Sequence, residues 1–131
     1  MKTNLDKFKA NKELENNGVD FALDDKTSFR VRRFGPNNPK MKAAHAQYFK
    51  PYAYQLEKGL LADEKVKEIN LRMFIDTCLV SWEGVEDEKG NPIEFSKEAA
   101  YDVLKDNSDI ADALYKYSQE ATNYRVEVGN S

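Results

Sequence analysis

The fold is decided by Leu71–Phe95, LRMFIDTCLVSWEGVEDEKGNPIEF, in which a long apolar run ends abruptly in a polar turn. From about Glu64 to Trp82 the chain reads as a helix whose second half is apolar on nearly every side, and Asp63 is a suitable N-cap. A helix that is apolar all round is buried in the protein interior. The sequence therefore predicts a central buried helix over residues 64–82, with Trp82 in the core.

The polar turn after this run contains residues with well-defined local preferences. Gly84 can adopt the left-handed conformation that closes a helix, and Gly90 supplies a positive φ in the acidic loop. Pro92 prevents further helix, and Ser96 offers a side-chain oxygen to the first amide groups of the next helix. These residues predict a sharp corner followed by a new helix from Ser96 to Lys105. Their roles are structural, and none of them is chemically reactive.

Upstream of the central run, the apolar period changes from that of a helix to that of a strand. Val19–Leu23 and Phe29–Arg33 alternate apolar and polar side chains around the turn-like residues 24–27. Two alternating runs about a short polar loop are typical of a β-hairpin, and a lone hairpin must pack on helices to be stable. The sequence predicts such a hairpin within residues 18–34. Residues 1–17 are lysine-rich and predict only a short, frayed helical arm.

The remaining residues, 39–125, show helical periodicity. A helix is expected from Lys40 to Lys58, kinked or split at Pro51, which lacks a backbone donor. The last helix is expected to begin at Asn107 or Ser108. Residues 126–131 are expected to form a flexible tail. The chain is thus predicted to be one α+β domain, mainly α, with an N-terminal β-hairpin packed on a bundle of about four helices.

Composition limits the classes of function. A net charge of −3 disfavours a protein that binds nucleic acid by charge. The single cysteine suits a reducing compartment, and no window is apolar enough for a membrane helix or a signal core. We therefore expect a protein of the cytoplasm that binds neither nucleic acid nor membrane.

The sequence offers no set of residues for catalysis, metal binding or cofactor binding. His45 is the only histidine, and Cys78 lies in the predicted core, away from any partner that would activate it. The segment from Asp87 to Glu98 matches the calcium-loop pattern only at its ends. We therefore expect no enzyme activity, no metal and no cofactor.

Two features are candidates for partner binding. Arg30 and Arg32 would share the strand face opposite Phe29, although a charged outer face on an exposed hairpin is the commoner reason for such a cluster. Tyr54 and Tyr115 fall off the apolar stripes of their helices and are expected to be exposed. Exposed aromatic side chains often anchor partners, and ordinary surface tyrosines are the alternative.

The linear order of these segments resembles a known family. Gly18–Phe21, Phe29–Arg33 and the apolar run are followed by Trp82-Glu83-Gly84-Val85 and by Asp87–Ser96, a W-x-G-V…D-x-x-G-x-P-I-x-F-[ST] pattern. The chain is similar, over residues 18–124, to tail assembly chaperones of long-tailed bacteriophages. The shared pattern is a structural signature, and it carries no catalytic or ligand residue across.

The resemblance implies a non-enzymatic protein of the host cytoplasm that binds the long, helical tape-measure protein and keeps it soluble during tail assembly. It implies the tape-measure protein as partner, with self-association or contact with other tail proteins as further options. The alternative is a structural component of the virion, such as a tail or head–tail connector accessory protein. A small DNA-binding regulator is a third class, which the acidic charge disfavours.

Overall fold

The computed structural model describes residues 3–35 and 37–126. Within these residues the chain forms an antiparallel sheet of three strands in the order β1-β2-β3, together with helices that make up most of the structure. The strands are β1 (Val19–Ala22), β2 (Ser28–Val31) and β3 (Leu79–Glu83). The α-helices are α1 (Lys12–Asn17), α2 (Met41–Phe49), α3 (Ala53–Glu57), α4 (Asp63–Thr77), α5 (Lys97–Lys105) and α6 (Ser108–Gln119), and the 3-10 helices are η1 (Asn4–Phe8), η2 (Lys50–Tyr52) and η3 (Ala121–Tyr124). The predicted class, α+β and mainly α, is confirmed.

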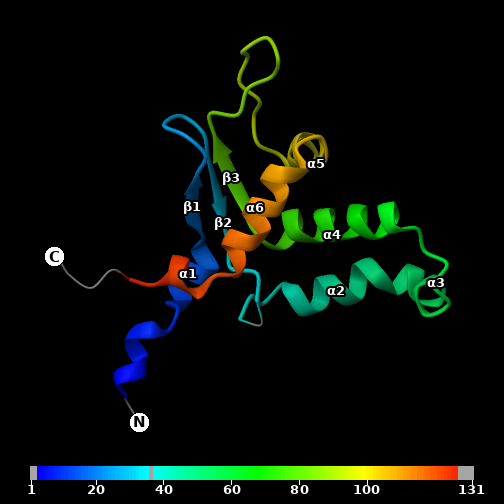
Figure 1. The fold of residues 1–131 in the computed structure, drawn as a ribbon, viewed down its shortest axis with the longest axis horizontal. Helices are drawn as coiled ribbons and strands as arrows, with labels where there is room; N and C mark the ends of the chain where they lie inside the picture. The colour runs from blue at the N-terminus through cyan, green and yellow to red at the C-terminus, as the bar shows by residue number, and fades with distance from the viewer. Residues whose placement is uncertain (1–2, 36, 127–131) are drawn as a thin grey trace.

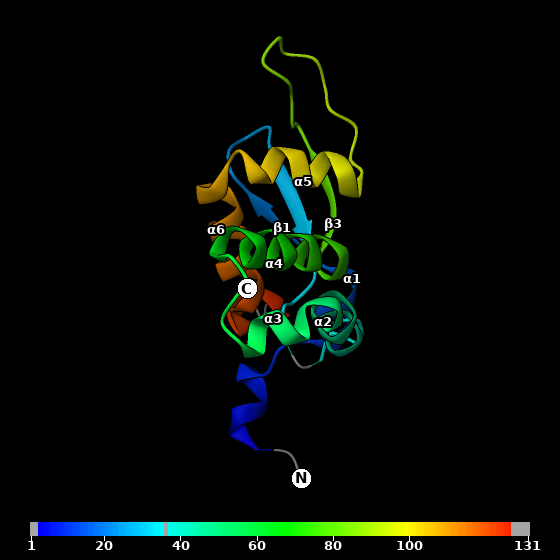
Figure 2. The same ribbon diagram turned by 90° about the vertical axis from the view of Figure 1, so that its right-hand side faces the viewer.

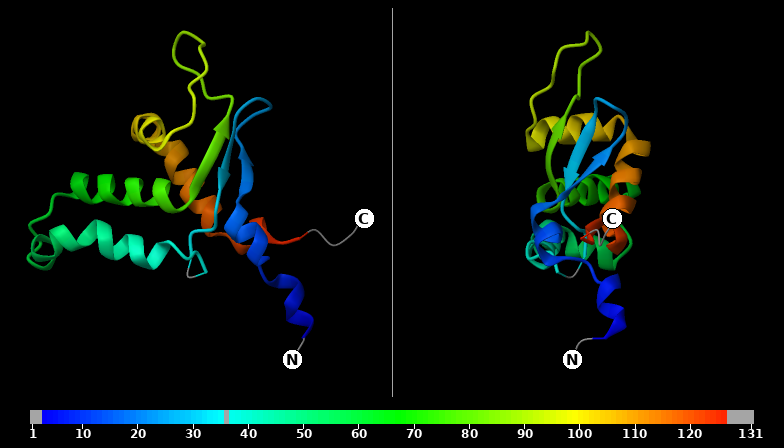
Figure 3. Two further views of the ribbon diagram at one scale, coloured as in Figure 1. Left: turned by 180° about the vertical axis from the view of Figure 1, so that it is seen from behind. Right: turned by 90° about the vertical axis from the view of Figure 1, so that its left-hand side faces the viewer.

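The helices fall into two groups around the sheet. α5, α6 and the C-terminal half of α4 supply the side chains that pack on β2 and β3 in the main core. α2, η2, α3 and α4 form an arm that extends away from the sheet, with α2 and α4 side by side and α3 at the far end (Figure 1). Figure 2 looks along this arm. The segment between β3 and α5 projects beyond one end of the sheet, and η1 extends from the opposite end (Figure 3).

The predicted hairpin is confirmed. β1 and β2 pair antiparallel with Val19 opposite Val31 and Phe21 opposite Phe29. The Asp24 side chain accepts hydrogen bonds from the amides of Lys26 and Thr27 at 2.8 and 2.7 Å, which fixes the turn. Phe29 and Val31 are buried, as their alternation with arginine predicts.

The predicted central helix is wrong at its C-terminal end. α4 ends at Thr77, and Leu79–Glu83 form β3, which pairs with β2 and places Trp82 opposite Phe29. A short run that is apolar on all sides fits a buried strand as well as a buried helix, and the pairing with β2 decides the outcome. Lys97 stabilises the junction, since its ammonium group donates to the carbonyl oxygens of Ile75 and Leu79 at 2.8 and 2.7 Å.

The residues expected to end or begin helices near α4 and α5 are confirmed in part. Gly84 has the expected positive φ of 76°, but it closes a strand and not a helix. Gly90 has the predicted positive φ, 83°. Ser96 caps α5 as predicted, with its hydroxyl oxygen accepting from the Ala99 amide at 3.0 Å. Asp63 is the first residue of α4, one position after the N-cap where it was expected.

The two ends of the chain and the break at Pro51 agree with the sequence where the structure describes them. The helix expected over residues 40–58 is split at Pro51, where η2 separates α2 from α3. The N-terminal arm contains η1 and α1, and α1 ends at Gly18. The last helix begins at Ser108, directly after Asn107, as expected. The tail expected at residues 126–131 lies, apart from Val126, outside the described residues.

Candidate partner-binding surface

The described part of the chain contains no obvious catalytic or metal centre. No group of His, Cys, Asp and Glu side chains among these residues could hold a metal ion. Cys78 is fully buried, and this burial raises the pKa of its thiol to about 11, so that the nucleophilic thiolate is not populated at neutral pH. No helix in residues 3–35 and 37–126 is long and apolar enough to cross a membrane.

The arm carries apolar side chains on two sides, and only one side packs on the rest of the protein. On the first side, Ala44 is buried and Met41 reaches the main core. The second side faces solvent as a shallow groove of about 440 Å³. This groove is lined by His45, Ala46, Phe49, Lys50, Ala53 and Leu56. Among the described elements, α2 packs mainly on α4, while the side that carries the groove is open to solvent.

Large apolar residues remain exposed at the far end of the arm. Tyr54 is 68% exposed, Leu60 is 69% exposed, and Leu56 at the edge of the groove is 41% exposed. The ring of His45 lies 5.0 Å from that of Phe49, so the groove floor is partly aromatic. Exposed apolar side chains that gather on one element mark interaction surfaces more often than those scattered singly.

The charge on the α2 side of the groove is positive, although the protein as a whole is acidic and Glu57 follows Leu56 on α3. The segment from Lys26 to Leu56 contains no Asp or Glu, so all 23 acidic residues lie elsewhere. Lys42 and Lys50 are exposed, and in residues 3–35 and 37–126 no carboxylate lies within ion-pair distance of either. On α4, by contrast, Glu68 pairs with Lys65 at 3.0 Å and with Arg72 at 3.6 Å.

The two tyrosines singled out from the sequence lie on different parts of the molecule. Tyr54 is on α3 at the far end of the arm, while Tyr115 is on α6 beside the sheet (Figure 1). Tyr115 is 41% exposed, and its ring packs 4.8 Å from Phe34 and 5.9 Å from Phe74. Tyr54 belongs to the arm surface, whereas Tyr115 is an edge residue of the core.

The two arginines singled out from the sequence bind the connection between α1 and β1. Arg30 forms an ion pair with Asp20 at 3.3 Å and donates to the carbonyl oxygen of Gly18 at 3.2 Å. Arg32 donates to the carbonyl oxygen of Asn16 at 2.7 Å. Their guanidinium groups therefore hold the N-terminal helix against the hairpin.

A second, smaller hollow of about 190 Å³ lies between α4 and α5. The guanidinium of Arg72 stacks on the ring of Tyr101 at 3.7 Å and approaches Glu98 at 3.8 Å. Because these polar groups already pair with each other, we interpret this hollow as part of the packing between the two helices.

Sequence reasoning missed the groove residues. Ala46 and Phe49 lie on α2, and Ala53 and Leu56 lie on α3, which turns across the end of α2 after η2 (Figure 2). The apolar period of residues 40–58 predicts one inward stripe of Met41, Ala44, Tyr48, Tyr52 and Leu56. This prediction is wrong for Leu56, which is 41% exposed and lines the groove, because the break at η2 turns α3 away from the direction of α2.

Comparison with known proteins places the chain in a family. The model of a family described as YdaY prophage protein matches residues 36–129, which is more than half of the chain. This range includes the whole arm, β3, α5 and α6. No curated protein and no solved structure matches the chain. The protein therefore belongs to the YdaY prophage protein family and is of phage origin.

Proposed function

We propose that this protein is a non-enzymatic tail assembly chaperone that binds the tape-measure protein in the host cytoplasm and keeps it soluble. The observation that carries the proposal is the uncovered apolar side of α2 and α3 on an arm that extends from the body. A long helical protein that exposes an apolar stripe before assembly needs such a surface to cover it. The phage origin of the family and the resemblance of residues 18–124 to tail assembly chaperones agree with this role.

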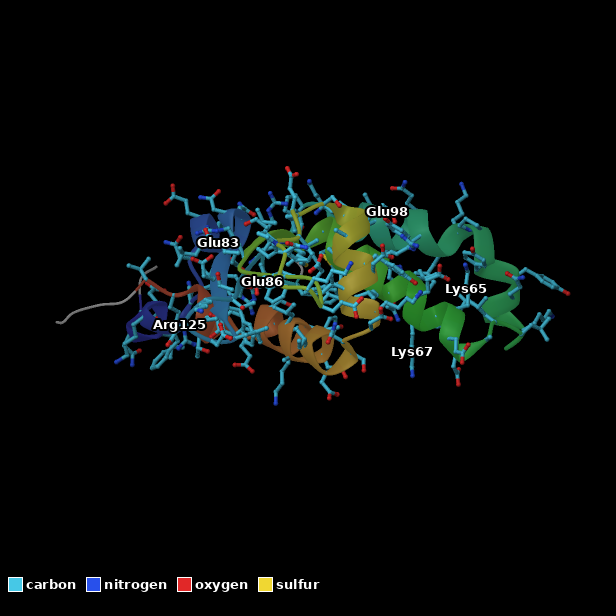
Figure 4. The ribbon with its side chains drawn as sticks, turned by 90° about the horizontal axis from the view of Figure 1, so that it is seen from above. Lys65, Lys67, Glu83, Glu86, Glu98 and Arg125 are labelled. Atoms are coloured by element: carbon cyan, nitrogen blue, oxygen red, sulfur yellow. The ribbon has the colours of Figure 1, made fainter. Side chains whose placement is uncertain are left out.

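The test is co-expression with the tape-measure protein of the same phage. We expect the soluble fraction of the tape-measure protein to rise when the chain is present. A double variant, Phe49→Ser with Leu56→Ser, should lose this effect, because it makes the groove polar while the core stays intact. Lys67→Ala, at an exposed position of α4 that points away from α2, is the control and should retain it (Figure 4).

Particle composition separates this role from that of a structural virion component. A chaperone is released before the tail is complete, so mass spectrometry of mature particles should find the chain absent or far below the level of tail proteins. Stoichiometric retention in mature particles, together with unchanged solubility of the tape-measure protein, would replace the chaperone role with the structural one.

A further inference from the structure

We propose that the groove on α2 and α3 binds an acidic amphipathic helix of a partner protein. This inference deepens the proposed function and rests on it only for the identity of the protein that carries the helix. It names the surface and the chemistry of the bound segment. Both follow from the shape of the groove and from the charges around it.

The floor of the groove presents apolar side chains on which a partner helix can pack. Ala46 and Ala53 alternate with Phe49 and Leu56 along the groove. The small alanines let a partner backbone come close, and the larger Phe49 and Leu56 can interdigitate with side chains of the partner. Ala46 and Phe49 come from α2 and Ala53 and Leu56 from α3, which turns across the end of α2 after η2, so the floor lies at the corner between the two helices (Figure 2). Docking of an amphipathic helix into an apolar groove is a common mode of peptide recognition, and it reads anchors spaced three and four residues apart.

The charges around the groove select an acidic partner. Lys42 and Ala46 lie on α2 and Lys50 follows it as the first residue of η2, and their spacing of four positions places the two lysines on the same side as Ala46. Lys50 itself lines the groove. Neither lysine is neutralised by a carboxylate in the described part of the chain. A helix with Glu or Asp beside its apolar stripe supplies the missing countercharge, whereas a basic helix is repelled.

A second copy of this chain fits the groove poorly. A two-fold pairing of groove against groove would bring Lys42 and Lys50 of both copies together, and like charges opposed in this way are unfavourable. The acidic loop between Gly84 and Phe95 has the required charge. In the described part of the chain, however, none of the large apolar side chains of this loop is exposed, so it offers no apolar stripe to the groove. It is also held as a turn, because the Asp87 side chain accepts from the amides of Lys89 and Asn91, both at 2.9 Å.

The inference is tested with two designed peptides and the full chain. Each peptide has about 18 residues, enough to form a helix on binding, with leucine at positions spaced three and four apart. The remaining positions are mainly glutamate in the acidic peptide and lysine in the basic one. Fluorescence anisotropy of the labelled peptides measures binding. We expect the acidic peptide to bind and the basic peptide to bind at least about tenfold more weakly.

Charge reversal on the protein provides the decisive comparison. Lys42→Glu with Lys50→Glu should weaken the acidic peptide by about tenfold or more and should strengthen the basic one. Lys67→Glu is the matched control, because Lys67 is exposed on α4 and points away from α2 (Figure 4). All these residues are on the surface, so circular dichroism should show an unchanged fold.

Three results would overturn the inference. The first is equal binding of the acidic and basic peptides, or no binding of either. The second is a loss of binding in Lys67→Glu as large as that in the double variant. The third is sedimentation of the protein as a dimer that the double variant dissociates, since a second copy would then occupy the groove.

Failure of this inference is distinguishable from failure of the proposed function. If the chain solubilises the tape-measure protein but binds no acidic peptide, the chaperone role stands and the assigned surface chemistry falls. If the acidic peptide binds with the expected charge dependence but the tape-measure protein gains no solubility, the groove is supported and the chaperone role falls.

Discussion

The indole nitrogen of Trp82 donates a hydrogen bond of 2.8 Å to the carbonyl oxygen of Ile93. The same indole packs edge-on against the rings of Phe95, with centroids 5.2 Å apart, and Phe29, at 6.0 Å. Through these contacts one side chain joins β3 to β2 and to the segment that leads into α5. The pairing explains why the W-x-G-V and P-I-x-F parts of the sequence pattern occur together.

Replacing Trp82 should therefore destabilise the fold strongly. Trp82 is 8% exposed, and Trp82→Ala should lower the free energy of unfolding by about 3–5 kcal/mol, as expected for a large-to-small change in a core. Urea denaturation followed by circular dichroism measures this. Because Trp82 is the only tryptophan, native fluorescence also reports its environment. An emission maximum typical of tryptophan in water would contradict the burial.

Gly84 and Gly90 offer a matched pair of substitutions. Both have positive φ, 76° and 83°, so alanine at either position carries a backbone cost of about 1–2 kcal/mol. A Cβ at Gly84 would also collide with the carbonyl group of Lys26 in the hairpin turn, while a Cβ at Gly90 would meet nothing within 4 Å. Thermal denaturation should therefore show a clearly larger loss for Gly84→Ala than for Gly90→Ala. Equal losses would mean that the contact between the two turns is unimportant.

Local sequence signals predict those parts of the fold that depend on neighbouring residues. The alternation of apolar and polar residues predicts the pairing of β1 with β2, and Ser96 predicts the start of α5. The change from α4 to β3 at Cys78 depends instead on the edge of β2 and on the ammonium group of Lys97, 18 positions from Leu79. No window of local sequence contains these partners, so the periodicity of the apolar run indicated one long helix.

The candidate surface was less predictable than the fold. The exposure of Tyr54 follows from its position off the helical stripe, and the structure agrees. Arg30 and Arg32 also lie where alternation places them, yet their hydrogen bonds to Gly18 and Asn16 are long-range and cannot be read from spacing. The groove exists because no other element packs on this side of the arm, and the local sequence does not show how the arm is placed relative to the rest of the fold.

Stability at alkaline pH should depend on Cys78. Burial raises the pKa of the folded thiol to about 11 from an ordinary value of 9.0. Between these values the unfolded chain loses the thiol proton and the folded chain keeps it, so ionisation favours unfolding. The contribution of the protonated thiol is intact below pH 9 and should fall by about 2 kcal/mol by pH 10.5.

A variant without the thiol isolates this effect from other titrating groups. Burial also raises the pKa of Tyr124, which destabilises the folded state in the same direction at high pH. Cys78→Ala retains Tyr124, so the difference in unfolding free energy between the two proteins at pH 8 and pH 10.5 reports Cys78 together with its electrostatic coupling to Tyr124 and Lys97. A difference that does not change with pH would contradict the buried, neutral thiol. A thiol reagent should also react slowly with the native protein and quickly in denaturant.

The two tyrosines should separate binding from stability. Tyr54 is 68% exposed, so Tyr54→Ala should change the free energy of unfolding by less than about 0.5 kcal/mol. Tyr115 packs on Phe34 and Phe74, so Tyr115→Ala should cost about 1–2 kcal/mol, while Tyr115→Phe retains the ring and should cost little. In co-expression with the tape-measure protein, Tyr54→Ala should reduce the soluble fraction because Tyr54 lies on the same arm as the groove. Tyr115→Phe should leave that fraction unchanged, and the opposite pattern would move the binding surface from the arm to α6.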